Sequence, residues 1–504
     1  MRSLFLNADI ATLDDAHPAG RCLLVNDGVI EGVLDDAPTG LPWAVKVIDC
    51  EGGFMVPGFH DCHAHLTATG LLSGKHDLSA CRDIDSMLKQ LEQLAASEQI
   101  IFAGNFDETK LAERRHASLR ELDAACGDRP ALLSRVDGHS CVVNSAALAL
   151  LGVDTAQAGV DRDEQGAPTG RLFGPANYAV QVGFVNRMPF KQHRRADREA
   201  AGLALSAGIT TLHNVIEGDA SYEILREIYI DNAVLPLHVI PKSCSTNIGK
   251  IKRLGGKLFG GDIFVDGSIG SRTAALEDRY RDLDSRGLLY LRRERLAELF
   301  FEAAEAGLSP GVHAIGDDAI EQAVGAWEDV LARRGSLDGL RPSIDHFEIA
   351  RPDHITRAAR LGVFLSMQPA FDYLWGGQGG MYEQRLGQER AVSMNLLGTA
   401  RRAGCVVCAG SDSPVTNISA LLGIHSAVNH NVPAERLSVD EALRCYTCDA
   451  AKLSFGEDRC GRLMPGMAAD LAILEKRLDS VAADSIKDVQ VRMTVVDGVV
   501  QYPA

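Results

Sequence analysis

The sequence has no long apolar run and no strongly basic cluster. No stretch of about 18 or more apolar residues could span a bilayer, and the start, MRSLFLNADIATLDD, lacks the features of a signal peptide. We therefore expect a soluble, cytoplasmic protein that does not enter a membrane. The 68 acidic side chains outnumber the 51 basic ones and give a net charge of −17, which argues against nucleic-acid binding.

Low-complexity sequence is also missing, so the composition indicates a folded protein. The 504 residues are 46% hydrophobic and 24% charged, close to the average for globular proteins. Because a single core usually stops growing well before this length, we expect two structural units.

The 12 cysteines include two C-x-x-C pairs, Cys405 with Cys408 and Cys445 with Cys448. Such pairs occur in zinc ribbons and in redox sites. The first pair lies in the apolar run AGCVVCAG, which is typical of a buried strand, and the second lies in the helical pattern EALRCYTCDAAKL. We therefore interpret both pairs as buried, reduced thiols.

Both ends of the chain are rich in short β-type runs, unlike the middle. RCLLVNDGVIEGVL near the start and VQVRMTVVDGVVQY near the end each contain an Asp-Gly pair, which favours a tight hairpin turn. We predict that residues 1–56 and 456–504 together form one small β-sandwich domain, with the rest of the chain inserted between its halves.

Residues 57–455 show strands followed by helices, the pattern of a parallel sheet. Eight candidate strands, the number that a closed α/β barrel requires, lie in MVPGFHDCHAHL, GITTLHNV, VLPLHVI, DIFVDGS, SPGVHAIG, PSIDHFE, VFLSMQP and VVCAGSD. The predicted fold is therefore α/β, with a TIM-like (β/α)8 barrel. The segment at about 70–200 is too long for a simple loop, so we expect an insertion after the first barrel strand.

The strongest local signal for a site is PGFHDCHAHL, in which one residue separates His63 from His65 at the end of an apolar run. Residues i and i+2 of a strand point to the same face, so both imidazoles can reach one metal ion. His60 faces the other way in an ideal strand and is interpreted as structural.

Three more side chains of metal-binding type follow predicted strands. His313 in GVHAIGDD, His346 in SIDHFE and Asp412 in CAGSDSP each lie at the carboxyl end of a strand. These ends meet at one mouth of a barrel, where active sites form. Each residue alone could be a satisfied polar core residue, but their recurrence at corresponding positions favours a metal site.

These motifs resemble the amidohydrolase superfamily, in particular amidohydrolase family 3, its YtcJ-like branch. The likeness runs over nearly the whole chain, and FVDGSIGSRTAAL together with VHAIGD is its most diagnostic part. The resemblance implies a metal-dependent hydrolase of carbon–nitrogen bonds other than peptide bonds, with one or two Zn²⁺ ions. By position, it assigns the metal ligands to His63, His65, Asp262, His313, His346 and Asp412.

One position departs from the family pattern. Many relatives have a lysine four residues before the aspartate of the DGS motif, often carboxylated to bridge two metals, whereas this chain has Asp262. A carboxylate can hold or bridge metal but is shorter than a carboxylated lysine, and Lys257 is out of register to replace it. The number of metal ions is therefore left open.

The predicted reaction is attack of a metal-bound hydroxide on an amide, N-acyl or N-substituted formamide carbon. A bound metal lowers the pKa of water from ~15.7 toward ~7, which makes the nucleophile available at neutral pH. Asp412 is expected to accept the proton and pass it to the leaving nitrogen. His346 is the second catalytic candidate, which could polarise the electrophile if it is not a ligand.

Four residues are candidates for shaping the substrate pocket: His139 and Arg272 as substrate-binding residues, with Asp137 and Asn144 beside them. Asn144 could instead cap a helix, and Arg272 could form an ordinary salt bridge. The glycine-containing stretch FDYLWGGQGGMYEQR after the seventh strand could be a mobile lid or a surface turn.

Two alternatives remain beside the hydrolase. A deaminase of a heterocyclic amine would use the same chemistry and release ammonia, and a catalytically silent scaffold would hold little metal. The expected partner is a small-molecule substrate whose identity the sequence leaves open, as it does the oligomeric state, including a homodimer.

Overall fold

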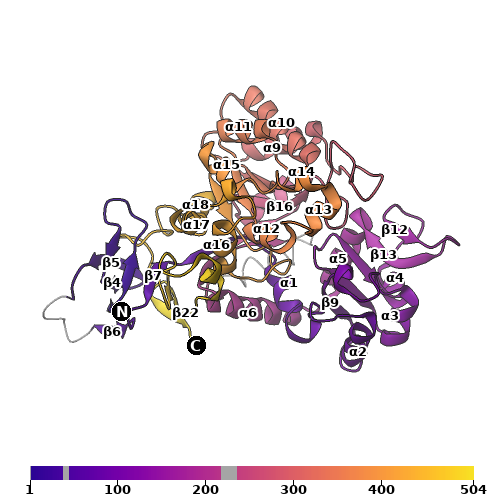
Figure 1. Cartoon of the computed structure of the whole chain (residues 1–504), viewed down its shortest axis with the longest axis horizontal. Helices are drawn as coiled ribbons and strands as arrows, with labels where there is room; N and C mark the ends of the chain where they lie inside the picture. Colours follow the sequence, from indigo (N-terminus) through magenta and orange to yellow (C-terminus); the bar gives the residue numbers. More distant parts are fainter. Residues whose placement is uncertain (1, 38–44, 217–234, 504) are drawn as a thin grey trace.

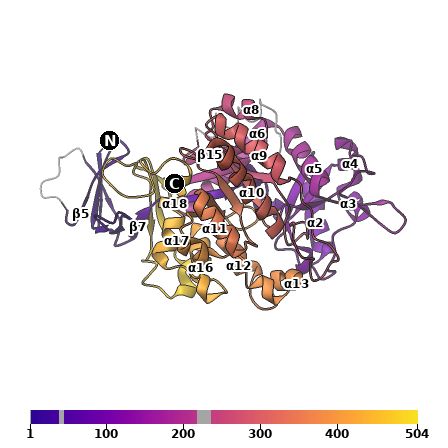
Figure 2. The ribbon, with the colours of Figure 1, turned by 90° about the horizontal axis from the view of Figure 1, so that it is seen from above.

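The structure is a computed structural model that describes residues 2–37, 45–216 and 235–503 (Figure 1). A β-rich end carries both termini, a central region combines parallel strands with helices, and a separate lobe lies on the far side. Figure 2 shows the same succession of three regions from above. Within the described ranges, every helix is too short or too polar to cross a bilayer.

Both ends of the chain form the β-rich region. Its elements are β1 (Arg2–Leu6), β2 (Asp9–Ala11), β3 (Ala19–Gly20), β4 (Cys22–Asn26), β5 (Val29–Leu34), β6 (Lys46–Asp49), β7 (Phe54–Pro57), β21 (Leu471–Leu474), η5 (Ala483–Asp488), β22 (Val491–Val496) and β23 (Val499–Tyr502). One sheet has the order β5-β4-β1-β6 and the other β23-β22-β21-β7-β2-β3. Because Ile473 of β21 lies opposite Met55 of β7, strands from the two ends share one ladder.

The two Asp-Gly pairs make the hairpin turns that the sequence predicts. Asp27 and Gly28 join β4 to β5 with φ values of 48° and 82°, and Asp497 and Gly498 join β22 to β23 with φ values of 46° and 74°. Two successive positive φ values define the turn whose twist matches that of the flanking strands, and Asp and Gly tolerate them. These turns set the pairing of both hairpins.

The described part of the central region contains eight parallel strands. They are β8 (Phe59–Ala64), β14 (Ile209–Ile216), β15 (His238–Ser243), β16 (Leu258–Phe264), β17 (Ser309–Ala314), β18 (Ser343–His346), β19 (Phe364–Met367) and β20 (Val407–Ala409). Hydrogen bonds order them as β15-β14-β8 and β16-β17-β18-β19-β20, and a parallel bridge joins Ala64 to Ser413 beyond β20. Each of the eight predicted runs contains or overlaps one of these strands, although β15 overlaps only the end of its run.

Helices pack around these strands. They are α6 (Phe190–Ser206), α8 (Ile248–Leu254), α9 (Arg293–Glu305), α10 (Asp317–Arg334), α11 (Pro352–Leu361), α12 (Pro369–Trp375), α13 (Met381–Leu386), α14 (Gln388–Ala391), α15 (Leu397–Arg402), α16 (Ala420–Val428), η4 (Pro433–Glu435), α17 (Val439–Cys445) and α18 (Cys448–Leu453). In α10, acidic residues begin the helix and Gly335 ends it in the left-handed conformation, as the helix dipole and C-cap geometry favour. Its Trp327 stacks on Phe300 of α9, with ring centroids 4.4 Å apart, inside the main core.

The far lobe lies between β8 and β14 in the chain. It contains α1 (Leu66–Leu71), η1 (Gly74–His76), α2 (Ile84–Ala95), β9 (Ile101–Phe106), η2 (Glu108–Lys110), α3 (Leu119–Cys126), β10 (Ala131–Arg135), β11 (Ser140–Val143), α4 (Ser145–Leu151), β12 (Val160–Arg162), β13 (Pro168–Phe173) and α5 (Gly174–Arg187). Its five strands form a sheet of order β12-β13-β11-β10-β9 with its own apolar core. The loop after β10 contributes Asp137 and His139 to a cavity that His346 and Asp412 also line.

The cysteines are free thiols. Cys405, Cys408, Cys445 and Cys448 are all buried, and burial raises the pKa of Cys445 to about 12 and that of Cys405 to about 11. The structure therefore agrees with reduced, buried thiols in both C-x-x-C pairs.

Candidate metal centre

The six residues assigned as metal ligands lie at one end of the central strands. His63 is the next-to-last residue of β8 and His65 follows the strand, while Asp262, His313 and His346 belong to β16, β17 and β18. The sixth residue, Asp412, lies in the loop after β20. Because carboxyl ends of parallel strands face the same edge, residues far apart in sequence meet here.

Asp262 lies at the middle of the cluster. One of its oxygens is 3.5 Å from Nε2 of His63 and 3.7 Å from Nδ1 of His313, and the other is 3.3 Å from Nε2 of His65. His346 approaches the first oxygen to 3.9 Å. All of these side chains are buried.

Asp412 faces the same cluster from the loop after β20. Its Oδ1 lies 3.4 Å from Nε2 of His63 and 3.1 Å from Nε2 of His65. Three groups therefore each place ligand atoms within 4.8 Å of one another: His63, His346 and Asp412; His63, His65 and Asp262; and Asp262, His313 and His346.

Two of these residues occupy an uncommon backbone conformation. His346 has a φ of 72° and Asp412 a φ of 55°, in the left-handed region that non-glycine residues rarely adopt. Such conformations cost about 1–3 kcal/mol and persist where the surrounding structure holds them. Both occur where the strand has ended and the side chain turns into the cluster.

A buried carboxylate and a buried amine support His63 from behind. Asp345, next to His346 on β18, lies 2.8 Å from Nδ1 of His63, and Nζ of Lys242 on β15 lies 3.3 Å from the same carboxylate oxygen. An imidazole that donates Nδ1–H to a carboxylate presents Nε2 to a metal. Asp345 therefore turns Nε2 of His63 toward Asp262 and Asp412.

The charges of the cluster stabilise one another. Burial favours the neutral form of His63, but the negative charges of Asp262 and Asp412 outweigh it and raise the pKa of His63 well above its ordinary value. Burial likewise opposes ionisation of Asp262, yet the nearby imidazoles hold the pKa of Asp262 well below its ordinary value.

Several atoms of the cluster have no hydrogen-bond partner among the described residues. They include Nε2 of His63, Oδ1 of Asp262 and Nδ1 of His313. Unpaired buried polar atoms are costly, and four imidazoles with two carboxylates are a ligand set that divalent transition metals prefer. The residues present therefore fit a metal ion.

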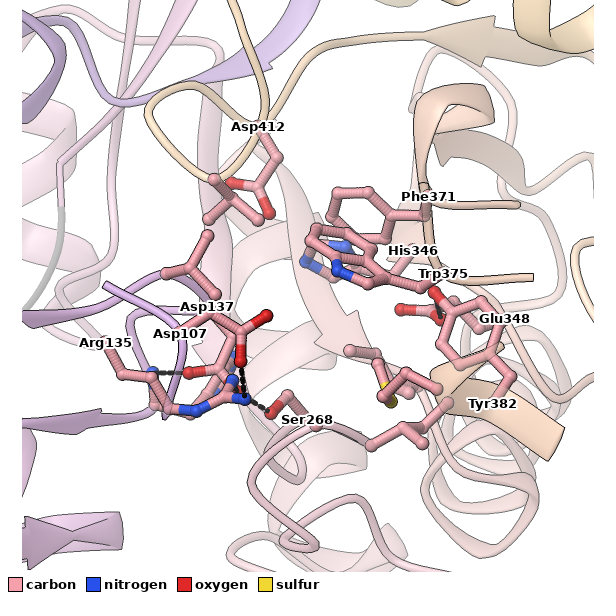
Figure 3. A pocket seen from close by; sticks show the side chains of 17 residues that line it. Asp107, Arg135, Asp137, Ser268, His346, Glu348, Phe371, Trp375, Tyr382 and Asp412 are labelled. Atoms are coloured by element: carbon pink, nitrogen blue, oxygen red, sulfur yellow. Dashed lines mark hydrogen bonds and ion pairs between the residues drawn. The ribbon is translucent and has the colours of Figure 1, made fainter. Parts of the chain in front are cut away.

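A cavity opens beside the cluster (Figure 3). It encloses about 490 Å³ of empty space, part of it open to solvent, which is within the usual range for small-molecule sites. His346 and Asp412 border it, Asp137 and Arg135 form one side, and Phe371, Trp375 and Tyr382 form the other. The last three belong to α12 and α13, so the predicted lid stretch forms part of the wall.

His139 lies between the cluster and this cavity. Its ring centroid is 5.0 Å from that of His313, and its Nδ1 shares a short hydrogen bond with the hydroxyl of Tyr178. Burial and the neighbouring His313 lower the pKa of His139 to about 3, so the imidazole is neutral. It can therefore offer a neutral donor to a bound molecule.

The other predicted pocket residues separate into two groups. Asp137 lines the cavity, whereas Asn144 caps α4 by accepting a hydrogen bond from the backbone of Ala147. Arg272 has a side chain that is 27% exposed and pairs with Asp282 at 2.8 Å, and it is not among the residues lining the cavity. Asn144 therefore acts as a helix cap and Arg272 as a member of a salt bridge, the two structural roles considered for them from the sequence.

Sequence reasoning missed Arg135, Asp345, Glu348 and Lys242. Asp345 and Glu348 flank His346 in SIDHFE, and Arg135 precedes Asp137 in SRVDGH, so proximity to identified motifs was the available signal. Nothing in the sequence around Lys242 distinguishes it. These four residues surround the ligands or line the cavity.

Comparisons with known proteins agree with this geometry. A profile described as that of an amidohydrolase family matches residues 46–502. The chain is similar to YtcJ of Bacillus subtilis, an amidohydrolase by name, with 28% identity over 550 aligned residues that cover 100% of this chain and 99% of the relative.

Two further matches also extend over the full chain. The N-substituted formamide deformylase of Arthrobacter pascens is 24% identical over 542 residues, which cover 100% of this chain and 98% of the relative. The crystal structure of a metal-dependent hydrolase from Pyrococcus furiosus superposes with a TM-score of 0.75 and 26% identity, covering 95% of this chain and 99% of that one. These similarities indicate a hydrolase.

Proposed function

The chain belongs to the amidohydrolase family, and on this basis we propose that it is a zinc-dependent hydrolase of a non-peptide carbon–nitrogen bond. The proposed bond is an amide, N-acyl or N-substituted formamide bond. One observation carries the proposal: four imidazoles and two carboxylates from the ends of β8, β16, β17, β18 and β20 meet in one buried cluster. The similarity to a formamide deformylase supports the same bond type.

The six clustered residues would hold one or two divalent ions. When bound, a zinc ion supplies Lewis-acid chemistry: it polarises a carbonyl oxygen and lowers the pKa of water. Asp262 has one oxygen near His63 and His313 and another near His65, so it would hold metal together with these imidazoles.

Asp412 is the proposed proton carrier. It faces His63 and His65 in the cluster and also lines the cavity. Its carboxylate therefore lies near both the proposed metal site and the cavity where a substrate would bind. It accepts a proton from water as the carbonyl carbon is attacked and then gives that proton to the leaving nitrogen. His346 borders the same space and would help to orient the carbonyl group.

His139 is the proposed substrate-binding residue. When the hydroxyl of Tyr178 donates to its Nδ1, the imidazole carries its proton on Nε2. A neutral N–H donor beside the cluster can bind the carbonyl oxygen as negative charge develops on it. Arg272 has no part in this proposal, because its guanidinium is directed to Asp282.

The finer architecture that positions this site is also a proposal. We propose that the eight parallel strands close as a (β/α)8 barrel and that residues 1–56 and 456–504 form a β-sandwich domain. The bridge between Ala64 and Ser413, which joins the first strand to the loop after the last, supports closure. The shared ladder of β7 and β21 supports a domain built from both ends of the chain.

Replacing Asp412 by Asn tests the proposal. Protein purified without chelator should contain at least one zinc ion per chain and hydrolyse a member of a panel of N-substituted formamides, N-acyl amines and cyclic amides. In D412N, we expect kcat to fall about 10²–10⁴-fold because the proton carrier is lost. The zinc content should change little, because five other ligand side chains remain.

Asp329→Asn is the matched control, since Asp329 pairs with Arg293 on the outer helices. Undiminished turnover in D412N would contradict the role of Asp412. Ammonia released from an amino-heterocycle would indicate a deaminase, and substoichiometric metal without turnover would indicate a silent scaffold.

A further inference from the structure

Acidic side chains outnumber basic ones in the lining of the cavity beside the cluster. Apart from the proposed ligands and His139, the ionisable side chains that line it are Asp107, Arg135, Asp137 and Glu348. One cation therefore faces three carboxyl groups. The partners of Arg135 decide whether the cavity can accept an anionic group.

Arg135 is fully engaged by acidic neighbours. Its Nε lies 2.7 Å from Glu108, one terminal nitrogen lies 2.7 Å from Asp137, and the other lies 3.5 Å from Asp107. Burial alone would raise the pKa of Asp137, but Arg135 and further hydrogen bonds outweigh it and lower that pKa to about 2. Each nitrogen of the Arg135 guanidinium already has an acidic partner, so Arg135 has no pair of N–H groups left to bind a substrate carboxylate.

Glu348 stands on the other side of the cavity without a cation. It is 3% exposed and accepts a hydrogen bond of 2.8 Å from the hydroxyl of Tyr382. Among the described residues, neither a Lys nor an Arg side chain pairs with it. A buried carboxylate without a cationic partner is unfavourable, so a ligand that supplies the cation gains from pairing with it.

Aromatic side chains line the same cavity as this carboxylate. Trp375 and Tyr382 line the cavity with Glu348 (Figure 3), and Phe371 packs edge-on against Trp375 with ring centroids 5.0 Å apart. Aromatic faces attract cations through their quadrupole, and a nearby carboxylate adds to this attraction. The same walls also accept a flat apolar group.

We propose that this cavity binds a nitrogen-centred cation of the substrate, an ammonium, amidinium or guanidinium group, between Glu348 and the rings of Trp375 and Tyr382. That the bound cation belongs to a substrate rests on the proposed function. His346 and Asp412 line the cavity and also belong to the cluster. The proposal implies that a free carboxylate on the substrate is rejected, so N-acyl amino acids are poor substrates and N-acylated diamines or amidines are good ones.

Equilibrium binding of unreactive probes tests this inference. Benzamidine, benzyl alcohol and benzoate have similar sizes and differ in charge, and isothermal titration to the zinc-loaded protein gives a dissociation constant for each. We expect benzamidine to bind at least about tenfold more tightly than benzyl alcohol, because a partly desolvated cation meets both a carboxylate and aromatic faces. In Glu348→Gln, this ratio should fall about tenfold.

Two further variants test the site without changing Glu348. Tyr382→Phe removes the hydroxyl that occupies Glu348 and keeps the ring, so the preference for benzamidine should persist or increase even if Glu348→Gln fails to fold. Glu389→Gln, on the exposed surface of α14, is the matched control and should show the wild-type ratio. Equal affinities for the three probes, or a ratio unaffected by Glu348→Gln, would overturn the inference.

The outcome is separable from that of the proposed function. Selective binding of benzamidine without hydrolysis of any amide would contradict the hydrolase and leave the cation site. Hydrolysis by a protein that binds the three probes equally would contradict the cation site alone.

Discussion

Asp345 illustrates how a residue outside the ligand set controls a ligand. It is fully buried between Lys242 and His63, and its contact with Nδ1 fixes which nitrogen of His63 faces the cluster. Burial disfavours the charged carboxylate, but Lys242 and His63 outweigh it and hold the pKa of Asp345 far below its ordinary value. The charge of Asp345 is thus part of what orients His63 toward the cluster.

Asp345→Asn should weaken zinc binding about 10–100-fold, the range found when a carboxylate partner of a metal-binding histidine is removed. The substitution keeps the size of the side chain but removes the negative charge that orients His63 and balances Lys242. Competition with a chelator of known affinity measures the change. Unaltered zinc affinity would show that Asp345 does not support His63.

At the scale of elements, β8 and the end of β20 approach so closely that a side chain does not fit. A Cβ on Gly410 would lie 2.6 Å from the backbone nitrogen of His63 and 2.9 Å from Oδ1 of Asp61. Backbone atoms cannot move aside without displacing the strand, so the glycine sets the spacing between His63 and Asp412.

Gly410→Ala should therefore lower stability by about 1–3 kcal/mol, the usual cost of overpacking, and reduce zinc content. Gly202→Ala is the control: Gly202 is exposed on α6 and a Cβ there meets nothing within 4 Å. Replacing a helical glycine by alanine should stabilise by about 0.5–1 kcal/mol. Thermal melting measures both, and equal melting temperatures for the two variants would disprove the close approach.

The start of α3 gives a pH-dependent prediction. Glu121 accepts hydrogen bonds from Arg115 and from the backbone of Ser118, which completes a capping box. The hydrogen bond with Arg115 is the main cause that lowers the pKa of Glu121 to about 2, from 4.5 in the unfolded chain. Because the pKa falls on folding, the ionised group stabilises the fold above pH 4.5, and this contribution disappears as the pH falls toward 2.

Glu121→Gln should lower stability by about 0.5–1 kcal/mol at neutral pH, a value reduced by the partial exposure of the pair. The difference from the wild type should stay constant between pH 7 and pH 5 and shrink below about pH 4.5. Urea unfolding at several pH values measures it, and a difference that grows as the pH falls would contradict the assignment.

At the scale of the whole molecule, the cluster ties together segments that are distant in the chain. Its side chains come from β8, β16, β17, β18 and the loop after β20, so an ion bound there links most of the central region. The unfolded chain cannot offer this arrangement, and binding to the native state alone stabilises it by mass action.

Removal of metal should therefore lower the melting temperature. At an ion concentration 100 times the dissociation constant, the stabilisation is about 2.7 kcal/mol. Treatment with a chelator should lower the melting temperature by several degrees, and added Zn²⁺ should restore it. An identical melting curve with and without chelator would contradict a metal bound by the folded state.

Local patterns predicted the parts of the fold that depend on local chemistry. The Asp-Gly turns lie where two positive φ values are needed, and apolar runs between helical segments became the parallel strands. β15 overlaps only the last three residues of the run VLPLHVI, because the register with β14 decides which residues pair. The family assignment was confirmed by the match over residues 46–502.

The sequence by itself determined which residues could meet at the cluster. His63 and His65 share a strand face, and His313, His346 and Asp412 follow strands whose carboxyl ends share an edge, so strand geometry alone brings them together. Only the tertiary structure decided that Arg135 is occupied by three carboxylates, that Glu348 faces the cavity without a cation, and that Arg272 turns to Asp282. These outcomes depend on how the far lobe and the loops pack, and packing between distant segments leaves no periodic trace in the sequence.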